Sequence, residues 1–389
     1  MEDSRDHEKR NAPEVLDWKI ERVKETSLEL KSEISGLWTR DPACNPFASP
    51  AFMEMMMVAA LARGHRVFLA KGIRGNGTLA ALWPVRLDSK KAMHVLPSFL
   101  CDYATAVYEP GVAQAELARG FTLLVERVKP RNILLQPVPG WGLTLGAAIQ
   151  GIETAGFRYR AFPFAQVPLL RGEGGPDGAQ AFKKSLCRSR SLKNYTNRIR
   201  RENGFVFEAD TGTRGIDQWA DQFCDAHIRR WQATSTPSKY RDAATREKLK
   251  AALHAWAGDN RLVRFSIHAM YRRITFVAGL ISNRTIIHFH TARLPVYNKL
   301  GTGNITVHLM GLWMLENGYD AIDFGLGDEP YKYYFANTTR PVWRIYAAES
   351  LFSASFARGC IEAYIRRKKS RMDIWEFIKT NGKRLYGMI

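Results

Sequence analysis

The sequence has few cysteines and no long apolar run, and each absence narrows what the protein can be. Its five cysteines are scattered without C-x-x-C spacing, so neither a zinc site nor a disulfide framework is indicated. The stretch MEMMMVAALA at 53–62 is far shorter than the roughly 18 residues of a transmembrane helix. The start, MEDSRDHEKRNAPEV, contains no apolar signal-peptide core. These absences predict a reduced, cytoplasmic protein.

Acidic residues are scarce relative to basic ones. Lysine and arginine exceed aspartate and glutamate by 19, and the isoelectric point is about 9.8. This imbalance favours partners such as phosphates, nucleic acid, anionic sugars or lipid headgroups, without choosing among them. The chain of 389 residues, 46% hydrophobic and 24% charged, is long enough for two globular domains.

A glycine- and proline-rich run, RGEGGPDG at 171–178, reads as a linker. It divides the chain into residues 1–170, residues 179–345, and a tail over 346–389. The two large parts show the same order of elements, each beginning with a β-hairpin (RVFLAKGI with TLAALWPVRL, and RLVRFSIHAM with ITFVAGLI). A helix and an apolar strand complete each pattern. We therefore expect an internal duplication of one mixed α/β unit.

The second part alone carries a glycine-rich turn, NKLGTGN at 298–304. It follows the strand TIIHFHTA and precedes a predicted helix over 304–317. Gly301 and Gly303 allow a ligand to approach the backbone, and N–H groups at a helix start bind anions. A loop without a ligand is the other interpretation of a lone G-x-G. Because the matching position of the first part, EPGVAQ, has one glycine, we expect chemistry in the second copy only.

The segment DFGLGDEPYKYYF at 323–335 follows the next predicted strand. Its acids, lysine and tyrosines can supply an acid, a base and a cation for an anionic ligand. The alternative is an acidic turn in which Asp328 and Glu329 are solvated while the tyrosines pack in the core.

Two histidines, His288 and His290, alternate along the strand before the glycine turn, so they are predicted to share one face. A histidine there can deprotonate an acceptor because its pKa lies near neutrality. As a metal site the pair lacks a third ligand. A core histidine bonded to a backbone carbonyl is the alternative for either one.

A basic helix is predicted over 183–201, with eight lysines and arginines and no acid. Leu192, Tyr195 and Ile199 form a narrow apolar stripe along it. This pattern is that of a solvated, weakly docked helix, or of a surface for an anionic acceptor or tRNA.

The loop NKLGTG resembles the coenzyme A pyrophosphate loop of the GNAT acyltransferase superfamily, Arg/Gln-x-x-Gly-x-Gly/Ala. The GDEPYKYYF segment is similar to the FemAB-like and cellulose-biosynthesis CelD-type branch of that superfamily. NPFASPAF at 45–52, LPSFLCDYATAV at 96–107, NILLQPVP and the basic helix resemble the same branch. The resemblance covers about residues 40–345. One position departs from it: Asn298 stands where the loop usually has Arg or Gln.

The resemblance implies two tandem GNAT-like domains, the first degenerate, and acyl transfer from acyl-coenzyme A without a metal. The acceptor would be an amine or hydroxyl, on a small molecule or a cell-envelope or exopolysaccharide precursor. His290 is expected as the base and Tyr331 as the acid, with Asp323 as a third catalytic residue. The loop residues Asn298, Lys299, Gly301, Thr302, Gly303 and Asn304 would hold the cofactor. His288, Asp328 and Lys332 would contact the substrate.

Two alternatives stay open. One is aminoacyl transfer from a charged tRNA, as in FemAB-type relatives, and the other is a non-catalytic module that binds nucleic acid or an anionic polymer. The tail after 345, with RRKKSR at 366–371, is expected to form amphipathic helices that dock on the body or touch the inner face of the membrane.

Overall fold

The computed structural model describes residues 15–97, 99–172, 176–187, 190–232, 237–349 and 361. At 176, 177, 191 and 298–300 it describes the backbone but not the side chains. The predicted helical tail therefore lies almost entirely outside the described residues. Within the described part of the chain, no helix is long and apolar enough to cross a membrane.

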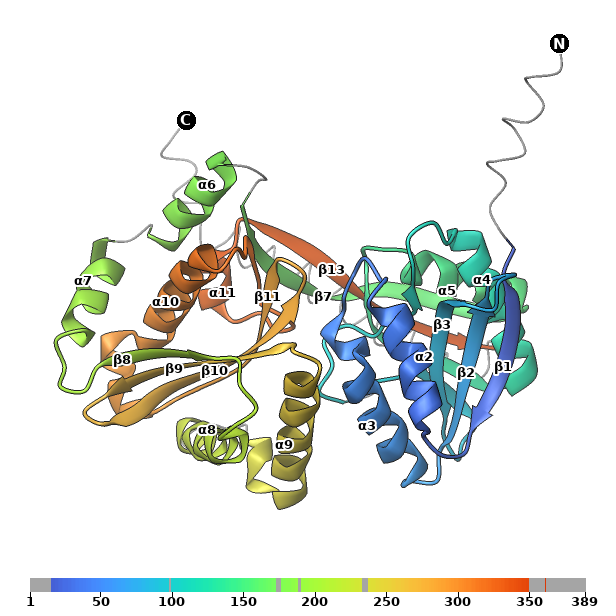
Figure 1. Ribbon diagram of the computed structural model, residues 1–389, viewed down its shortest axis with the longest axis horizontal. Helices are drawn as coiled ribbons and strands as arrows, with labels where there is room; N and C mark the ends of the chain where they lie inside the picture. The colour runs from blue at the N-terminus through green and yellow to red at the C-terminus, as the bar shows by residue number, and fades with distance from the viewer. Residues whose placement is uncertain are drawn as a thin grey trace, which may run out of the picture.

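The first half alternates strands and helices (Figure 1). Its elements are β1 (Asp17–Val23), α2 (Leu28–Trp38), α3 (Pro50–Leu61), β2 (Arg66–Ile73), β3 (Leu79–Leu87), β4 (Ala92–Val95), β5 (Val107–Tyr108), α4 (Gln114–Val128), β6 (Asn132–Pro139), α5 (Thr144–Thr154) and β7 (Arg158–Arg171). The predicted hairpin is β2–β3, and the predicted helix and strand after it are α4 and β6.

The second half repeats this alternation. Its elements are α6 (Pro176–Leu186), α7 (Arg190–Ile199), β8 (Val206–Asp210), α8 (Ile216–Trp231), η2 (Lys239–Arg241), α9 (Ala243–Gly258), β9 (Leu262–Ala269), β10 (Arg272–Ser282), β11 (Thr285–Arg293), η3 (Pro295–Leu300), α10 (Thr302–Glu316), β12 (Ala321–Asp323), α11 (Pro330–Phe335) and β13 (Thr338–Ala348). Helix α6 begins inside the run 171–178 that reads as a linker in the sequence.

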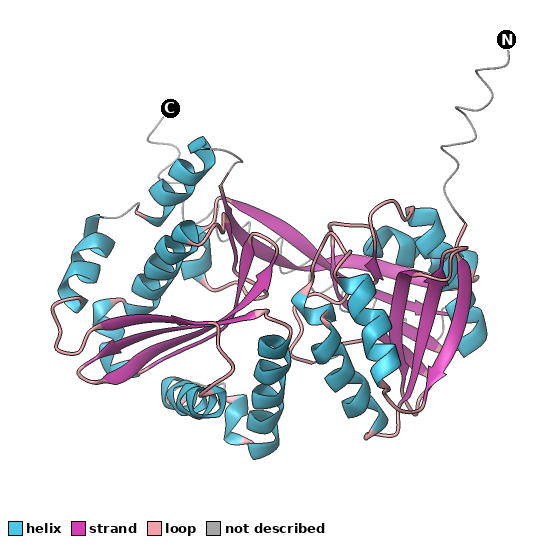
Figure 2. Ribbon diagram, viewed as in Figure 1, coloured by secondary structure: helices cyan, strands magenta, loops and turns pink. Residues whose placement is uncertain are grey.

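All strands join one mixed sheet in the order β1-β2-β3-β4-β6-β13-β7-β12-β11-β10-β9-β8, with β5 paired to β3. The two halves interlock, because β13 runs between β6 and β7, and β7 also pairs with β12. Figure 2 shows helices on both faces of the second half's strands. Helices α8 and α9 cover one face, and α10 packs on the other. The fold is therefore mixed α/β, as predicted, with strands shared between the halves.

The basic helix predicted over 183–201 is divided between α6 and α7. Leu192 and Ile199 are buried, as the predicted apolar stripe requires, and Thr196 is buried with them. Tyr195, the third predicted member of the stripe, is instead 43% exposed. Its ring lies on the basic outer surface because Thr196 takes the buried position and donates its hydroxyl to the carbonyl of Leu192 (2.8 Å).

The two halves share an apolar core. Phe52 of α3 stacks on Trp256 of α9 with ring centroids 4.5 Å apart, and the Trp256 indole N–H donates to the carbonyl of Pro46 (3.0 Å). Burying such aromatic pairs is worth about 0.5–1.5 kcal/mol beyond their area. The shared core holds the first half firmly against the second, which fixes the position of first-half side chains near the site described below.

Asp41, in the loop after α2, gives a pH-dependent stability. It is 2% exposed. Its Oδ1 accepts the N–H of Ala43 (2.9 Å), and Oδ2 has no hydrogen-bond partner. Burial raises the pKa of Asp41 to about 7. Between pH ~4 and ~7 the unfolded chain therefore releases this proton while the folded one keeps it, so stability falls as pH rises.

We expect Asp41→Asn to stabilise the protein at pH 8 by on the order of a few kcal/mol, because the variant has no carboxylate to bury. At pH ~2, where the acid is protonated in both states, the variant should match the parent. Denaturant unfolding at the two pH values checks this. An equal effect at both would contradict the argument.

Candidate active site

The glycine turn forms the N-terminal end of α10. Gly301 adopts a left-handed conformation (φ +65°), which a residue without a Cβ adopts at little cost. Its carbonyl accepts the N–H groups of Asn304 (3.0 Å) and Ile305 (3.1 Å), so the helix begins at Thr302, two positions before the expected 304. N–H groups of a first helical turn lack acceptors within the helix and, with its dipole, favour an anion.

Arg293, at the end of β11, lies against this helix start. A Cβ built at Gly303 would be 2.8 Å from Nη1 of Arg293, so the guanidinium occupies the space that a side chain would need. Burial and the charge of Arg230, on α8, lower the pKa of Arg293. Two arginines therefore lie beside the turn, in which Asn298 is an uncharged residue. The side chains of Asn298 and Lys299 are outside the described ones.

The sheet opens beside this turn. Strand β11 pairs with β12 only from Thr285–Ala321 to Ile287–Asp323, while β11 continues to Arg293 and β12 ends. Beyond Ile287 the edge of β11 that faces β12 is consequently free of β12. This opening and the start of α10 lie at the same end of β11.

A β-bulge overturns the expectation that His288 and His290 share one face. In the β10–β11 ladder, His290 lies opposite Ala278 and His288 opposite the adjacent Gly279, leaving Phe289 as an extra residue. Since Ala278 and Gly279 point to opposite faces, so do the two histidines. His288 meets Tyr331 on the α11 side (ring centroids 6.1 Å). His290 meets Tyr240 on the other side (6.2 Å).

Both histidines are poor proton acceptors at neutral pH. Burial and the charge of Lys332 lower the pKa of His288 to about 4. Burial, with Lys239, lowers the pKa of His290 well below its usual range. The Nε2 atom of His290 is buried without a hydrogen-bond partner. Each ring is therefore neutral at pH 7.

Asp323 is held on all sides. Its Oδ1 accepts the Tyr103 hydroxyl (2.7 Å) and the N–H of Gly325 (2.8 Å), and its Oδ2 accepts Nη2 of Arg340 (2.7 Å). It is 1% exposed, and burial raises its pKa. These contacts suit a residue that fixes the end of β12 better than one that exchanges protons.

Asp102, from the first-half segment LPSFLCDYATAV, reaches the same place. Its Oδ2 accepts the N–H of Leu326 (3.1 Å). A Cβ at Gly325 (φ +62°) would lie 2.5 Å from that oxygen, so glycine allows the close approach. Asp102 is half-buried, and burial raises its pKa to about 6. Together with Tyr103 it shows that the first half contributes to the site, which we expected in the second copy alone.

The residues of the DEPYKYY segment have different environments: some are buried and bonded, and others are exposed. Lys332 is 4% exposed and donates to the carbonyl of Leu326 (2.7 Å) and to Glu329 (2.9 Å). Burial, then Glu329, raises the pKa of Tyr331, so its phenol stays protonated. Asp328 is exposed on the turn. Tyr331 therefore packs against His288 of β11, Lys332 holds the turn at Leu326, and Asp328 faces solvent.

Loop η2 adds a group that sequence reasoning missed. Burial lowers the pKa of Lys239, and the charge of Asp102 opposes that shift. The same ammonium acts on His290, so Lys239 lies within electrostatic reach of both. Nearby, Nδ1 of His227 is 2.8 Å from the Ser238 hydroxyl. No sequence signal marks Lys239, because its neighbours come from distant parts of the chain.

Comparison with known proteins identifies a family model and solved structures that the chain resembles. The family model described as an acetyltransferase (GNAT) domain matches residues 187–333. The structure is similar to that of FemX, with a TM-score of 0.54, 8% identity and coverage of 84% of this chain and 97% of that one. It is also similar to L-PGS from Bacillus licheniformis, with a TM-score of 0.53, 10% identity and coverage of 86% and 96%. No curated protein matches the sequence. Residues 187–333 are therefore similar to a GNAT acetyltransferase domain, within a mixed α/β chain whose fold resembles those of FemX and L-PGS.

Proposed function

We propose that the protein transfers an acyl group from acyl-coenzyme A to an amine or hydroxyl of a small molecule or glycan precursor. One observation carries the proposal: the sheet opens between β11 and β12 directly beside a glycine-started helix with an arginine at its tip. An opening of this kind accommodates a long narrow donor, and the helix start accommodates its phosphates.

The donor's pyrophosphate would be bound by the first-turn N–H groups of α10 at Thr302 and Gly303, since the N–H of Asn304 donates to the carbonyl of Gly301 (3.0 Å). Arg293, with Arg230 near it, supplies the positive charge that Asn298 does not. Charge-assisted hydrogen bonds to phosphate are among the strongest that proteins form. When bound, acyl-coenzyme A supplies a thioester, which is already activated for attack.

The acceptor's proton would go to a group beside the opening. Asp102 suits this role best, because its pKa of about 6 leaves it ionised at pH 7 yet still basic. His290 is the second candidate, on the opposite face from His288. Asp323 and Lys332 hold the turn at Gly325 and Leu326, against which Asp102 lies. Backbone N–H groups along the free edge of β11 would donate to the oxyanion. The protonated Tyr331 would return a proton to the leaving thiolate.

A second candidate, aminoacyl transfer from a charged tRNA, is favoured by the outer surface of α6 and α7. The exposed cations there are Lys183, Lys184, Arg190, Lys193, Arg198 and Arg200. Thermal unfolding with acetyl-coenzyme A or with aminoacyl-tRNA separates the two candidates. We expect acetyl-coenzyme A to raise the melting temperature, since a ligand at 100 times its Kd adds about 2.7 kcal/mol of stability. Stabilisation by aminoacyl-tRNA alone would reverse the assignment of donor.

A further inference from the structure

One corner of the second half exposes apolar side chains. Val206 is 52% exposed, Met270 48% and Tyr271 86%, and together we call them the apolar tip. Val206 lies in β8 opposite His268, near the end of β9. Met270 and Tyr271 form the β9–β10 turn, where the N–H of Met270 donates to the carbonyl of Asn203 (2.6 Å). The corner lies at the end of the molecule remote from the first half (Figure 1).

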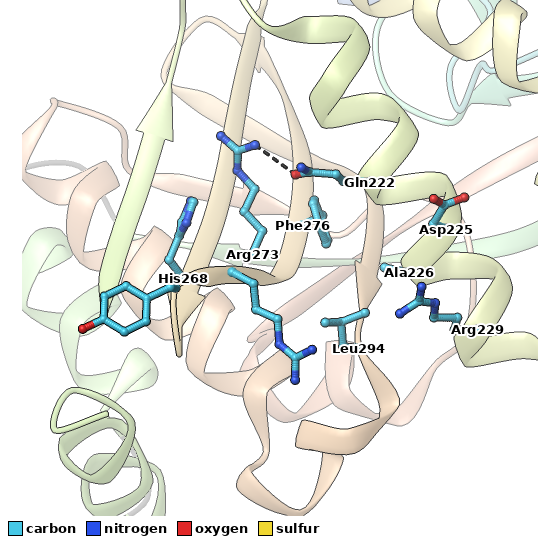
Figure 3. A pocket seen from close by; sticks show the side chains of 10 residues that line it. Gln222, Asp225, Ala226, Arg229, His268, Arg273, Phe276 and Leu294 are labelled. Carbon is cyan, nitrogen blue, oxygen red and sulfur yellow. Dashed lines mark hydrogen bonds between the residues drawn. The ribbon is translucent and has the colours of Figure 1, made fainter. Parts of the chain in front are cut away.

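A pocket of about 340 Å³ opens beside this tip. It is lined by Gln222, Asp225, Ala226, Arg229, His268, Tyr271, Arg272, Arg273, Phe276 and Leu294. Figure 3 shows Arg273 donating to Gln222 (3.0 Å) and Arg229 projecting from α8 toward Leu294.

Two of the three arginines keep uncompensated charge. Arg273 is paired with Glu208 (3.1 Å), and Asp225, the acid on the wall, is paired with Arg246 (2.8 Å). Arg272 donates to the hydroxyl of Tyr297 (2.9 Å), which is neutral. Among the described residues, neither Arg229 nor Arg272 has an acidic partner. The pocket is therefore built for an anion.

The tip and the pocket form one surface, because Tyr271 belongs to both and His268 lies between Val206 and Arg273 across the sheet. The exposed Arg200 and Arg201 precede Asn203, which contacts Met270. Basic residues thus surround exposed apolar ones, and this is the composition of surfaces that settle into a bilayer interface.

We infer that this corner docks the protein on an anionic phospholipid bilayer, with a lipid phosphate in the pocket and the apolar tip among the headgroups. The inference goes beyond the proposed function, since the lipid is a docking partner and not the acyl acceptor. RNA would also be attracted by the arginines, and its bases would stack on Tyr271. RNA binding, however, does not explain why the apolar side chains of Val206 and Met270 are exposed, whereas a bilayer interface would cover both.

The test is co-sedimentation of the full chain with vesicles of phosphatidylcholine, alone or mixed with phosphatidylserine. A pocket variant, Arg229→Gln with Arg272→Gln, removes the free cations. A tip variant, Met270→Asn with Tyr271→Asn, keeps the turn, because asparagine tolerates the left-handed conformation of both positions (φ 51° and 60°). We expect the parent to bind the mixed vesicles and each variant to bind at least tenfold more weakly.

Matched controls lie in the first half. Arg127→Gln with Arg131→Gln removes two exposed cations, and Leu28→Asn removes an exposed apolar side chain (87% exposed). Both should bind like the parent. The inference is overturned if the parent ignores the mixed vesicles, if the controls weaken binding as much as the variants, or if either variant binds normally. It is also overturned in favour of RNA if the tip variant loses oligouridylate binding by the same factor.

Discussion

Gly303→Asp should weaken coenzyme A binding by roughly 10- to 100-fold, about 1.5–3 kcal/mol, as measured by isothermal titration. The new Cβ would lie 2.8 Å from Nη1 of Arg293, so the carboxylate would take the arginine for itself and repel the pyrophosphate. The fold should survive, because an acid in the first turn of a helix is favourable to the helix.

The chain offers a close control for this substitution. A Cβ at Gly36, in α2, would lie 3.8 Å from Nη1 of Arg40, so Gly36→Asp also places a carboxylate beside a guanidinium. Coenzyme A affinity should be unchanged in that variant. If Gly303→Asp binds coenzyme A as the parent does while remaining folded, the turn at 301–303 is not the phosphate site.

The second large effect concerns Asp102. If it accepts the acceptor's proton, Asp102→Asn should lower kcat/KM about a hundredfold or more, because positioned proton transfer contributes 10²–10⁴. The base must be ionised, and its pKa is about 6. The rate of the parent should therefore rise with pH through about 6 and then level off, and the variant should lose that limb. Thiol release from acetyl-coenzyme A, with water or an amine as acceptor, provides the measurement.

Two further variants identify the cause of any loss of activity in Asp102→Asn. Asp41→Asn makes the same change at another buried acid of raised pKa, in the loop after α2, and should leave the pH–rate profile intact. His290→Ala tests the other candidate base. Loss of the limb in the His290 variant, with Asp102→Asn fully active, would assign the base to the histidine. Coenzyme A binding should persist in all three variants, which separates a failed base from a failed donor site.

The sequence predicted what depends on local patterning. Pairs of strand-like runs flanking a short turn identified the β2–β3 and β9–β10 hairpins, and the glycines of NKLGTGN located the start of α10 to within two residues. Tyr331 and Lys332, which were grouped as site residues by proximity in sequence, both lie on α11, where Tyr331 packs against His288 and Lys332 donates to Leu326; their role in a site stays a prediction. In each case the neighbours that decide the structure are only a few positions away.

What the sequence could not predict depends on distant contacts. The bulge at Phe289 is an irregularity of pairing with β10, and it reverses the face of His290 without any signal in the letters HFH. Asp102 meets Leu326 across 224 positions, and Arg293 meets Gly303 only because of the path of η3. In the sequence alone, Asp102, Arg293 and Gly303 stand in separate segments, and nothing in those segments indicates that they lie near one site.

The position of β13 in the sheet affects the order in which the sheet can form during synthesis. In the finished sheet, residues 338–348 separate β6 from β7, so during synthesis both strands wait for a partner. The stretch between Arg171 and Thr338 takes roughly ten to thirty seconds to translate at 5–20 residues per second. Throughout that interval the nascent first half carries an open seam, which attracts other unpaired strands. Its sheet is finished only when β13 emerges from the ribosome and closes that seam.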